Sequence, residues 1–184
     1  MRGKLKMKYL NRFWRANSGL AAVEFAFILP VMVIMFLGTV EVSNYVTAAR
    51  RVASISSTGA DLSAQEASIT NAEMNDIFGA LTTIMDPLKP TIAKIRISSV
   101  VADANGTTYR IAWSDARNDV PRVVGSIVSA ADFPAGLLVA FQGAIMCEVS
   151  YAYDPMFSNF LSGVTLKDKF YLKPRKSLTV LRTP

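Results

Sequence analysis

The feature that most constrains this chain is a long apolar run over residues 20–40, LAAVEFAFILPVMVIMFLGTV. Glu24 is the only charged residue in these 21 positions. As an α-helix the run would be roughly 31 Å long, at about 1.5 Å per residue, which matches the hydrocarbon core of a bilayer. A cleaved secretory signal would have a shorter apolar region followed by an A-x-A-like site, and neither is present. The run therefore predicts one transmembrane helix.

Basic residues precede the run and predict its orientation. Residues 1–19 contain no acid and six basic side chains: Arg2, Lys4, Lys6, Lys8, Arg12 and Arg15. The remaining 14 basic residues balance the 14 acids, so the formal net charge of +6 belongs to this leader. Positive flanks stay in the cytoplasm, so we expect the C-terminal domain to lie outside the inner membrane. The charge indicates a membrane flank, and no nucleic-acid partner is expected.

A short motif joins the leader to the apolar run. Gly19 is followed at the fifth position by Glu24 and at the sixth by Phe25. Glycine lacks a Cβ, so the backbone at this position can enter a protease site and interrupt the helix. A carboxylate one turn inside an apolar helix is costly unless it is paired. A less specific interpretation stays open, in which Gly19 only starts the helix and Glu24 reaches lipid head groups or Arg15.

This motif resembles the type IV prepilin processing site. The resemblance implies cleavage after Gly19 by an inner-membrane prepilin peptidase, with Leu20 as the new and often N-methylated N-terminus. It also implies that Glu24 pairs with the free α-amino group of a neighbouring subunit's Leu20. Glu24 and Phe25 are accordingly the expected assembly and register residues.

A longer segment, AAVEFAFILPVMVIMFLGTVEVSNYVTAARRVA, is similar to the TadE-like pseudopilin family of tight-adherence (Tad/Flp) pilus systems. Those proteins typically show a run like A-x-x-E-F-A-x-x-x-P, matched here by Ala21 or Ala22, Glu24, Phe25, Ala26 and Pro30. The resemblance is strongest over about residues 16–55 and diffuse afterwards. Major Flp pilins usually have tyrosine after the glutamate and are very short. Phe25 and the long C-terminal domain therefore imply a minor pseudopilin.

Pro30 lies inside the predicted membrane helix. It removes one backbone donor and predicts a helix kink near Ala26–Phe27. Two interpretations stay open: a proline that a membrane helix simply tolerates, or a flexible joint for inserting the helix into a fibre.

Periodicity beyond the membrane run predicts helices first. An amphipathic continuation should reach about Ser56, with a break at Ser57-Thr58-Gly59. A second helix should start near Thr70, whose hydroxyl precedes Glu73 as in a capping box. Asp86-Pro87 should end it. Its apolar stripe predicts core packing and consists of Met74, Ile77, Phe78, Leu81, Ile84 and Met85.

Alternating apolar residues then predict about four to five antiparallel strands. A hairpin is expected over residues 95–101 and 109–113, with further strands over 145–153 and 165–172. Residues 173–176 should lead into a mobile tail. The expected fold class is α+β, a pilin-like helix on an antiparallel sheet, with the strand order left open. The expected divisions are a basic leader (1–19), a transmembrane helix (20–40), a helical stalk (41–90) and an extracytoplasmic β-rich domain (91–184).

The residue types argue against an enzyme. The chain has no histidine and one cysteine, Cys147, which removes the commonest general base and excludes a thiolate metal site within one chain. Apolar neighbours favour Cys147 as a buried strand thiol over a reactive one. Solvated loop positions are expected for Asp115, Asp119, Asp132 and Asp154. We expect no cofactor and no metal.

The leading hypothesis is a minor pseudopilin or pilus assembly protein of a Tad-type (type IVc) pilus or secretion system. Its expected partners are pilin or other pseudopilin subunits, the inner-membrane pilus platform, prepilin peptidase and membrane lipid. Incorporation into a pilus is left open. The alternative is an unprocessed single-pass membrane protein whose outer domain binds a ligand or partner. An anchored enzyme is the least supported option, and a pocket joining Lys173, Arg175 and acids would favour it.

Overall fold

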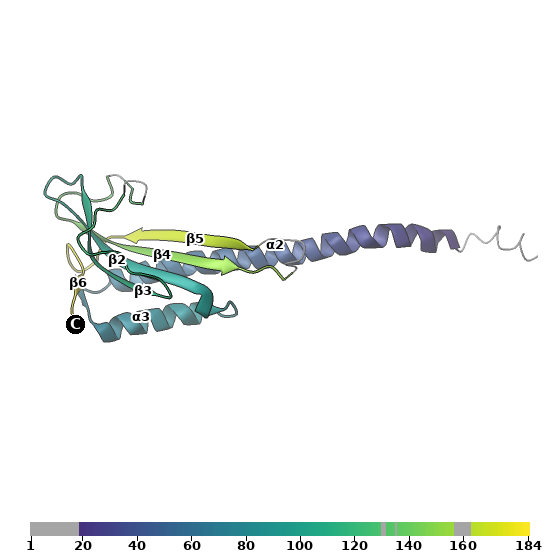
Figure 1. The fold of residues 1–184 in the computed structure, drawn as a ribbon, viewed down its shortest axis with the longest axis horizontal. Helices are drawn as coiled ribbons and strands as arrows, with labels where there is room; N and C mark the ends of the chain where they lie inside the picture. The colour runs from purple at the N-terminus through teal and green to yellow at the C-terminus, as the bar shows by residue number, and fades with distance from the viewer. Residues whose placement is uncertain (1–18, 130–131, 135, 157–162) are drawn as a thin grey trace, which may run out of the picture. The chain divides into compact units, whose positions relative to one another are not determined.

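The computed structural model describes residues 19–129, 132–134, 136–156 and 163–184. Most of the basic leader, residues 1–18, lies outside the described residues. The chain divides into two compact units, Met1–Asn44 and Tyr45–Pro184. In the first unit the described residues are almost entirely helical, and the second unit is an α+β domain (Figure 1).

The longest element is the helix α2 (Leu20–Ala64), which contributes to both units. The expected break at Ser57-Thr58-Gly59 is wrong, because these residues continue the helix. Tertiary packing explains the difference. A Cβ added at Gly59 would lie 2.8 Å from the Cys147 Sγ and 3.0 Å from a Leu81 methyl carbon. The glycine therefore marks a close approach of α2 to its neighbours and not the end of the helix.

The second helix, α3 (Asn71–Ile84), begins with the predicted capping box. The backbone N–H of Glu73 donates to Thr70 Oγ1 at 3.3 Å, and the backbone N–H of Thr70 donates to the Glu73 carboxylate at 2.7 Å. Two backbone donors of the helix start are thereby satisfied. The predicted apolar stripe is confirmed as core: Met74, Ile77, Phe78, Leu81 and Met85 are buried, and Ile84 packs against them.

Four antiparallel strands form the main sheet, and they confirm the predicted α+β class. They are β2 (Ala93–Ala102), β3 (Tyr109–Arg117), β4 (Gly143–Tyr153) and β5 (Val164–Leu172). Their spatial order is β3-β2-β4-β5, so the predicted β2–β3 hairpin lies at one side and β2 also pairs with β4. Between β2 and β3, the Asp103 carboxylate accepts hydrogen bonds from the backbone N–H groups of Asn105, Thr107 and Thr108.

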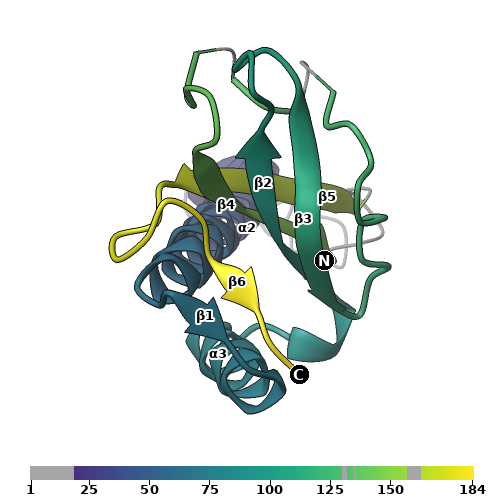
Figure 2. The ribbon, with the colours of Figure 1, turned by 90° about the vertical axis from the view of Figure 1, so that its left-hand side faces the viewer.

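The sheet buries side chains on both of its faces. On one face, Ile95, Cys147 and Val149 join the main core with α3 and with the part of α2 that follows Tyr45 (Figures 1 and 2). On the other face, a second cluster lies beneath the connection between β3 and β4, where Phe133 contacts the rings of Tyr109 and Tyr171 at centroid distances of 4.7 and 5.2 Å. We call this second face the outer face.

The C-terminal segment is packed against the domain. The short strand β6 (Leu181–Arg182) pairs in parallel with β1 (Ser68–Ile69), as Figure 2 shows. Val180 is 1% exposed, and its carbonyl accepts a hydrogen bond from Trp113 Nε1 at 2.8 Å. The expectation of a mobile tail is therefore wrong for this segment. Its partners lie far away along the chain, where no local pattern indicates them.

Candidate processing and assembly site

The Gly19–Leu20 peptide lies at the open start of α2. The helix begins at Leu20, which is 61% exposed. A Cβ added at Gly19 would meet no described atom within 4 Å. The first four N–H groups of any helix also lack intrahelical acceptors. Among the described residues, the space next to the Gly19 Cα is therefore open, and the Leu20 side chain is largely exposed.

Glu24 lies one helical turn after Leu20, on the same side of the helix and about 6 Å further along its axis. Glu24 is exposed, and the adjoining Phe25 is 57% exposed. Among residues 19–184, as far as they are described, no lysine or arginine forms an ion pair with Glu24. In a bilayer, this carboxylate therefore needs a partner from outside the described part of the chain.

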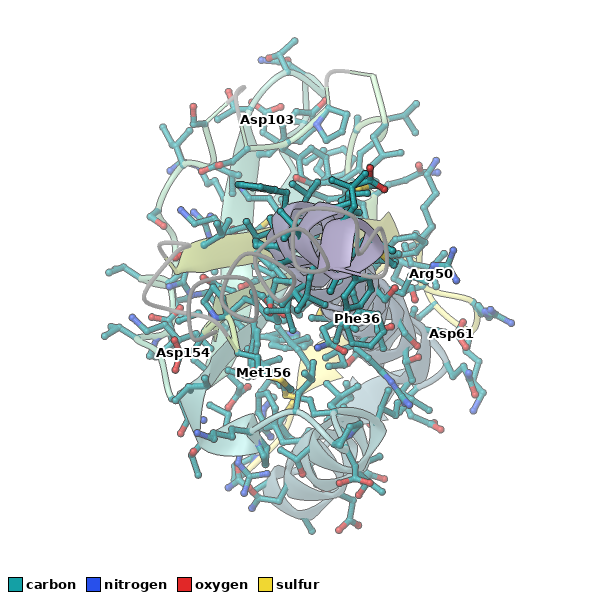
Figure 3. The ribbon with its side chains drawn as sticks, turned by 90° about the vertical axis from the view of Figure 1, so that its right-hand side faces the viewer. Phe36, Arg50, Asp61, Asp103, Asp154 and Met156 are labelled. Carbon is teal, nitrogen blue, oxygen red and sulfur yellow. The ribbon has the colours of Figure 1, made fainter. Side chains whose placement is uncertain are left out.

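The apolar surface around this motif is uncovered. Exposed fractions reach 77% at Phe27 and 68% at Phe36, which is labelled in Figure 3. Of the described helices, only α2 is long and apolar enough to cross a membrane, and none of its most apolar stretch is buried. The core helix of a soluble protein would bury such residues against other elements. The exposed apolar surface therefore indicates membrane insertion.

Pro30 lies within α2, which continues on both sides of it (Figure 1). The kink near Ala26–Phe27 stays a prediction. Further along, Thr39 Oγ1 donates to the Met35 carbonyl and Ser43 Oγ donates to the Thr39 carbonyl, each at 2.9 Å. These hydroxyl donors are satisfied by the helix itself, which suits residues at the end of an apolar span.

The α+β domain contains an ion-pair cluster that sequence analysis missed. Glu148 in β4 lies at its centre on the outer face. Arg122 donates from Nε and Nη2 to the two Glu148 carboxylate oxygens, each at 2.9 Å, and Arg96 Nη1 donates to Oε2 at 3.3 Å. Lys169 Nζ lies 3.5 Å from Oε1. Strand alternation could have placed Arg96, Glu148 and Lys169 on outer faces, but only the register brings them together.

Three of the four acids expected to be solvated are paired instead. Asp119 contacts Arg96 at 2.6 Å, and Asp132 contacts both Arg122 and Lys169. Asp115 lies in β3 rather than in a loop and contacts Arg182 at 2.9 Å. These partners are far apart in sequence, so composition could not reveal them. Asp154 is exposed, as expected.

The carboxylates and the cations of the cluster stabilise each other's charged forms. Burial would raise the pKa of Glu148, but hydrogen bonds from Arg122 and the charges of Arg122, Arg96 and Lys169 lower it overall. The hydrogen bond from Lys169 lowers the pKa of Asp132, and the hydrogen bond to Glu148 raises the pKa of Arg122. The groups therefore remain charged at neutral pH. Their pairing holds the β3–β4 connection against the sheet.

A metal site, or a pocket joining Lys173, Arg175 and acids, would favour an enzyme. No set of three Cys, Asp or Glu side chains among them could hold a metal ion. Lys173 Nζ donates to Gln142 Oε1 at 3.3 Å, whereas Arg175 pairs with Asp61, so these two cations have separate partners. Figure 3 likewise shows Asp61 well separated from Asp154.

Cys147 is confirmed as a buried strand thiol. It is 0% exposed in β4, and burial raises the pKa of its thiol to about 12. A thiol with so high a pKa is almost entirely protonated at neutral pH, and the thiolate is the reactive form. Its role is packing against α2 and α3.

Comparison with known proteins links the N-terminal segment to one family. Residues 19–61 match the model of the family described as TadE-like protein. The matched segment begins at Gly19 and includes Glu24, Phe25 and Pro30, which confirms the resemblance to TadE-like proteins. TadE-like pilus proteins are structural proteins, and the match indicates a Tad pilus-associated protein. No curated protein and no solved structure matches the chain.

Proposed function

We propose that this protein is a minor pseudopilin of a Tad-type pilus or secretion system, processed after Gly19 and anchored in the bacterial inner membrane by α2. One observation carries the proposal: the TadE-like match begins at Gly19, immediately before an uncovered apolar helix that holds Glu24 one turn inside. The domain from Tyr45 to Pro184 supports a minor subunit, because main fibre subunits of these systems are very short.

Cleavage would change the electrostatics of the helix start. Before cleavage the Leu20 nitrogen is a neutral amide, and afterwards it is a free amine that can carry a positive charge. This positive charge is unfavourable at the positive end of the helix dipole. A carboxylate from a second helix would relieve it.

The position of Glu24 would then set an axial register. Since Glu24 lies about 6 Å along the axis from Leu20, two parallel helices shifted by roughly one turn bring one carboxylate beside the other amine. A carboxylate left unpaired at the centre of a bilayer costs about 2.5–3.5 kcal/mol, and less near the interface. At other shifts the pair between the two subunits is lost, so this shift is favoured.

The remaining apolar surface would supply lateral contact. The exposed side chains of residues 25–36 can pack equally against lipid or against the helices of pilin and other pseudopilin subunits. Packing energy alone changes little when lipid is exchanged for a helix. The Glu24–amine pair therefore supplies the specificity, while the apolar face permits transfer from the membrane to an assembly at the inner-membrane platform.

Intact-mass measurement tests the processing step. The tagged protein is purified from membranes of strains with and without the prepilin peptidase. We expect a product that begins at Leu20 only in the strain with the peptidase. Gly19→Val is a suitable variant, because an added side chain there meets no described atom, and it should retain residues 1–19. An unchanged mass in both strains would contradict the proposal and favour the unprocessed single-pass alternative.

A further inference from the structure

The outer face of the sheet carries a row of polar side chains across three strands. The strand register places Lys94 in β2 beside Ser150 in β4, and Ser150 beside Lys167 in β5. Neighbouring strands are about 4.7–4.9 Å apart, so the backbones of the two lysines are roughly 10 Å apart, with the Ser150 hydroxyl between them. These residues line a shallow hollow of about 240 Å³ together with Arg96, Asp119, Glu148, Val149, Asp168 and Lys169.

Lys94 and Lys167 differ from the other cations of the hollow. Arg96 and Lys169 both contact Glu148, and each has a second carboxylate partner. For Lys94 and Lys167, no carboxylate of the described residues lies within 4.0 Å of the ammonium group. One end of the hollow is thus neutralised, and the other presents two exposed ammonium groups, each with three donors, around the Ser150 hydroxyl.

One exposed valine, Val120, adjoins the charged hollow through its neighbour Asp119. Val120 is 73% exposed, yet its backbone is fixed because its carbonyl accepts a hydrogen bond from Arg96 Nε at 2.8 Å. Two residues later, the backbone N–H of Arg122 donates to Ser114 Oγ at 3.0 Å. The valine is therefore held outward by groups of the ion-pair cluster. A fixed apolar side chain at the edge of a charged hollow can add an apolar contact to a site that binds by charge.

We propose that this surface docks an acidic segment of a partner subunit, with one carboxylate between Lys94 and Lys167 and an apolar side chain against Val120. The partner's identity as a neighbouring subunit rests on the proposed function, whereas the chemistry of the site does not. The charge pattern favours a protein segment over a lipid surface. Lipid-binding patches gather about four to eight basic residues, whereas only two unpaired basic residues line this hollow among the described residues, and Asp119, Glu148 and Asp168 line it as well.

Peptide binding to the purified full-length chain in detergent micelles tests the proposal. The probe is a fluorescein-labelled heptapeptide of alternating valine and glutamate, followed by fluorescence anisotropy. The Lys94→Gln/Lys167→Gln variant should bind about five- to tenfold more weakly, because each exposed ion pair contributes modestly. The matched control is Lys89→Gln, which changes an exposed lysine outside the hollow and should leave the affinity unchanged. Added salt should weaken binding by the native chain.

Each other result overturns the proposal. Equal affinity of the native chain and the double variant removes the role of the two lysines. Binding to phosphatidylglycerol vesicles that depends on both lysines, without peptide binding, identifies a lipid site. Self-association lost in the double variant, measured by sedimentation, identifies a second copy as the occupant. Far-ultraviolet circular dichroism and the protection of Cys147 from alkylation confirm folding of each variant. Peptide binding does not need cleavage at Gly19, so the two proposals fail separately.

Discussion

Gly59 in α2 lies so close to Cys147 in β4 that a Cβ added to the glycine would be 2.8 Å from the thiol sulfur. The small size of each residue therefore explains the close position of the other. The glycine permits the helix to approach the sheet, and the small thiol fits beneath it. This contact explains both an apparent helix breaker inside a helix and the buried position of the single cysteine.

Gly59→Ala should destabilise the domain by about 1–2 kcal/mol. Alanine in a helix normally gains about 0.5–1 kcal/mol over glycine, but overpacking of a core typically costs about 1–3 kcal/mol. Urea denaturation measures the difference. Gly79→Ala in α3 is the matched control, because an added Cβ there meets nothing within 4 Å, and it should stabilise the protein. Adding Cys147→Ala to Gly59→Ala should recover part of the loss, and full additivity of the two changes would contradict the contact.

Glu24→Ala should block assembly while leaving membrane insertion intact. Removing a carboxylate from an apolar helix makes insertion easier, but it removes the proposed partner of a neighbour's Leu20 amine. Membrane fractionation measures insertion, and electron microscopy or shear fractions of the cells measure pili. Glu24→Asp retains the charge and should retain part of the assembly. Normal pilus formation with Glu24→Ala would show that the role assigned to this residue is wrong.

Acid should weaken the domain through the Glu148 cluster. The folded-state pKa values of Glu148 and Asp132 are lowered, so their pairing stabilises the protein above their ordinary values of 4.5 and 3.8. That contribution is lost as the pH falls from these values through the lower folded-state values. Urea midpoints measured between about pH 7 and pH 2.5 should therefore be flat at first and decline below about pH 4.5.

Glu148→Gln should reduce this pH dependence and cost about 1–2 kcal/mol at neutral pH, because Arg122 and Arg96 lose a charged acceptor. Glu66→Gln is the control: its pair with Lys176 is exposed, with side-chain exposures of 46% and 58%. Such pairs contribute about 0–1 kcal/mol. If the two variants lose equal stability, the Glu148 cluster does not hold the β3–β4 connection in the way described.

Deleting residues 180–184 should destabilise the domain by about 2–4 kcal/mol, through lost burial of Val180 and an unsatisfied Trp113 N–H. Both groups are buried: Val180 is 1% exposed and Trp113 is 6% exposed. Thermal unfolding by circular dichroism measures the loss. Deleting only the exposed Pro184 should leave the unfolding temperature nearly unchanged. A full deletion without effect would mean that β6 does not contribute to the stability of the domain.

Local patterns in the sequence determined a large part of this protein. The apolar run of residues 20–40, the Thr70 capping box and the β2–β3 hairpin depend on residues within a few positions of one another, so periodicity and side-chain type suffice to predict them. The motif of Gly19 and Glu24 is equally local. The motif was identified from the sequence alone, and cleavage after Gly19 and pairing of Glu24 remain predictions.

Tertiary structure alone decided the features whose partners lie far apart along the chain. The strand order, the pairing of β6 with β1 and the Glu148 cluster join segments that no local pattern relates. The continuation of α2 through Gly59 is also decided by distant partners, which here override a local preference. The backbone preference of Gly59 taken alone favours a break in the helix, but packing against Cys147 and Leu81 outweighs that preference. Propensities of single residues are worth about 1 kcal/mol, whereas burial of a helix face is worth several.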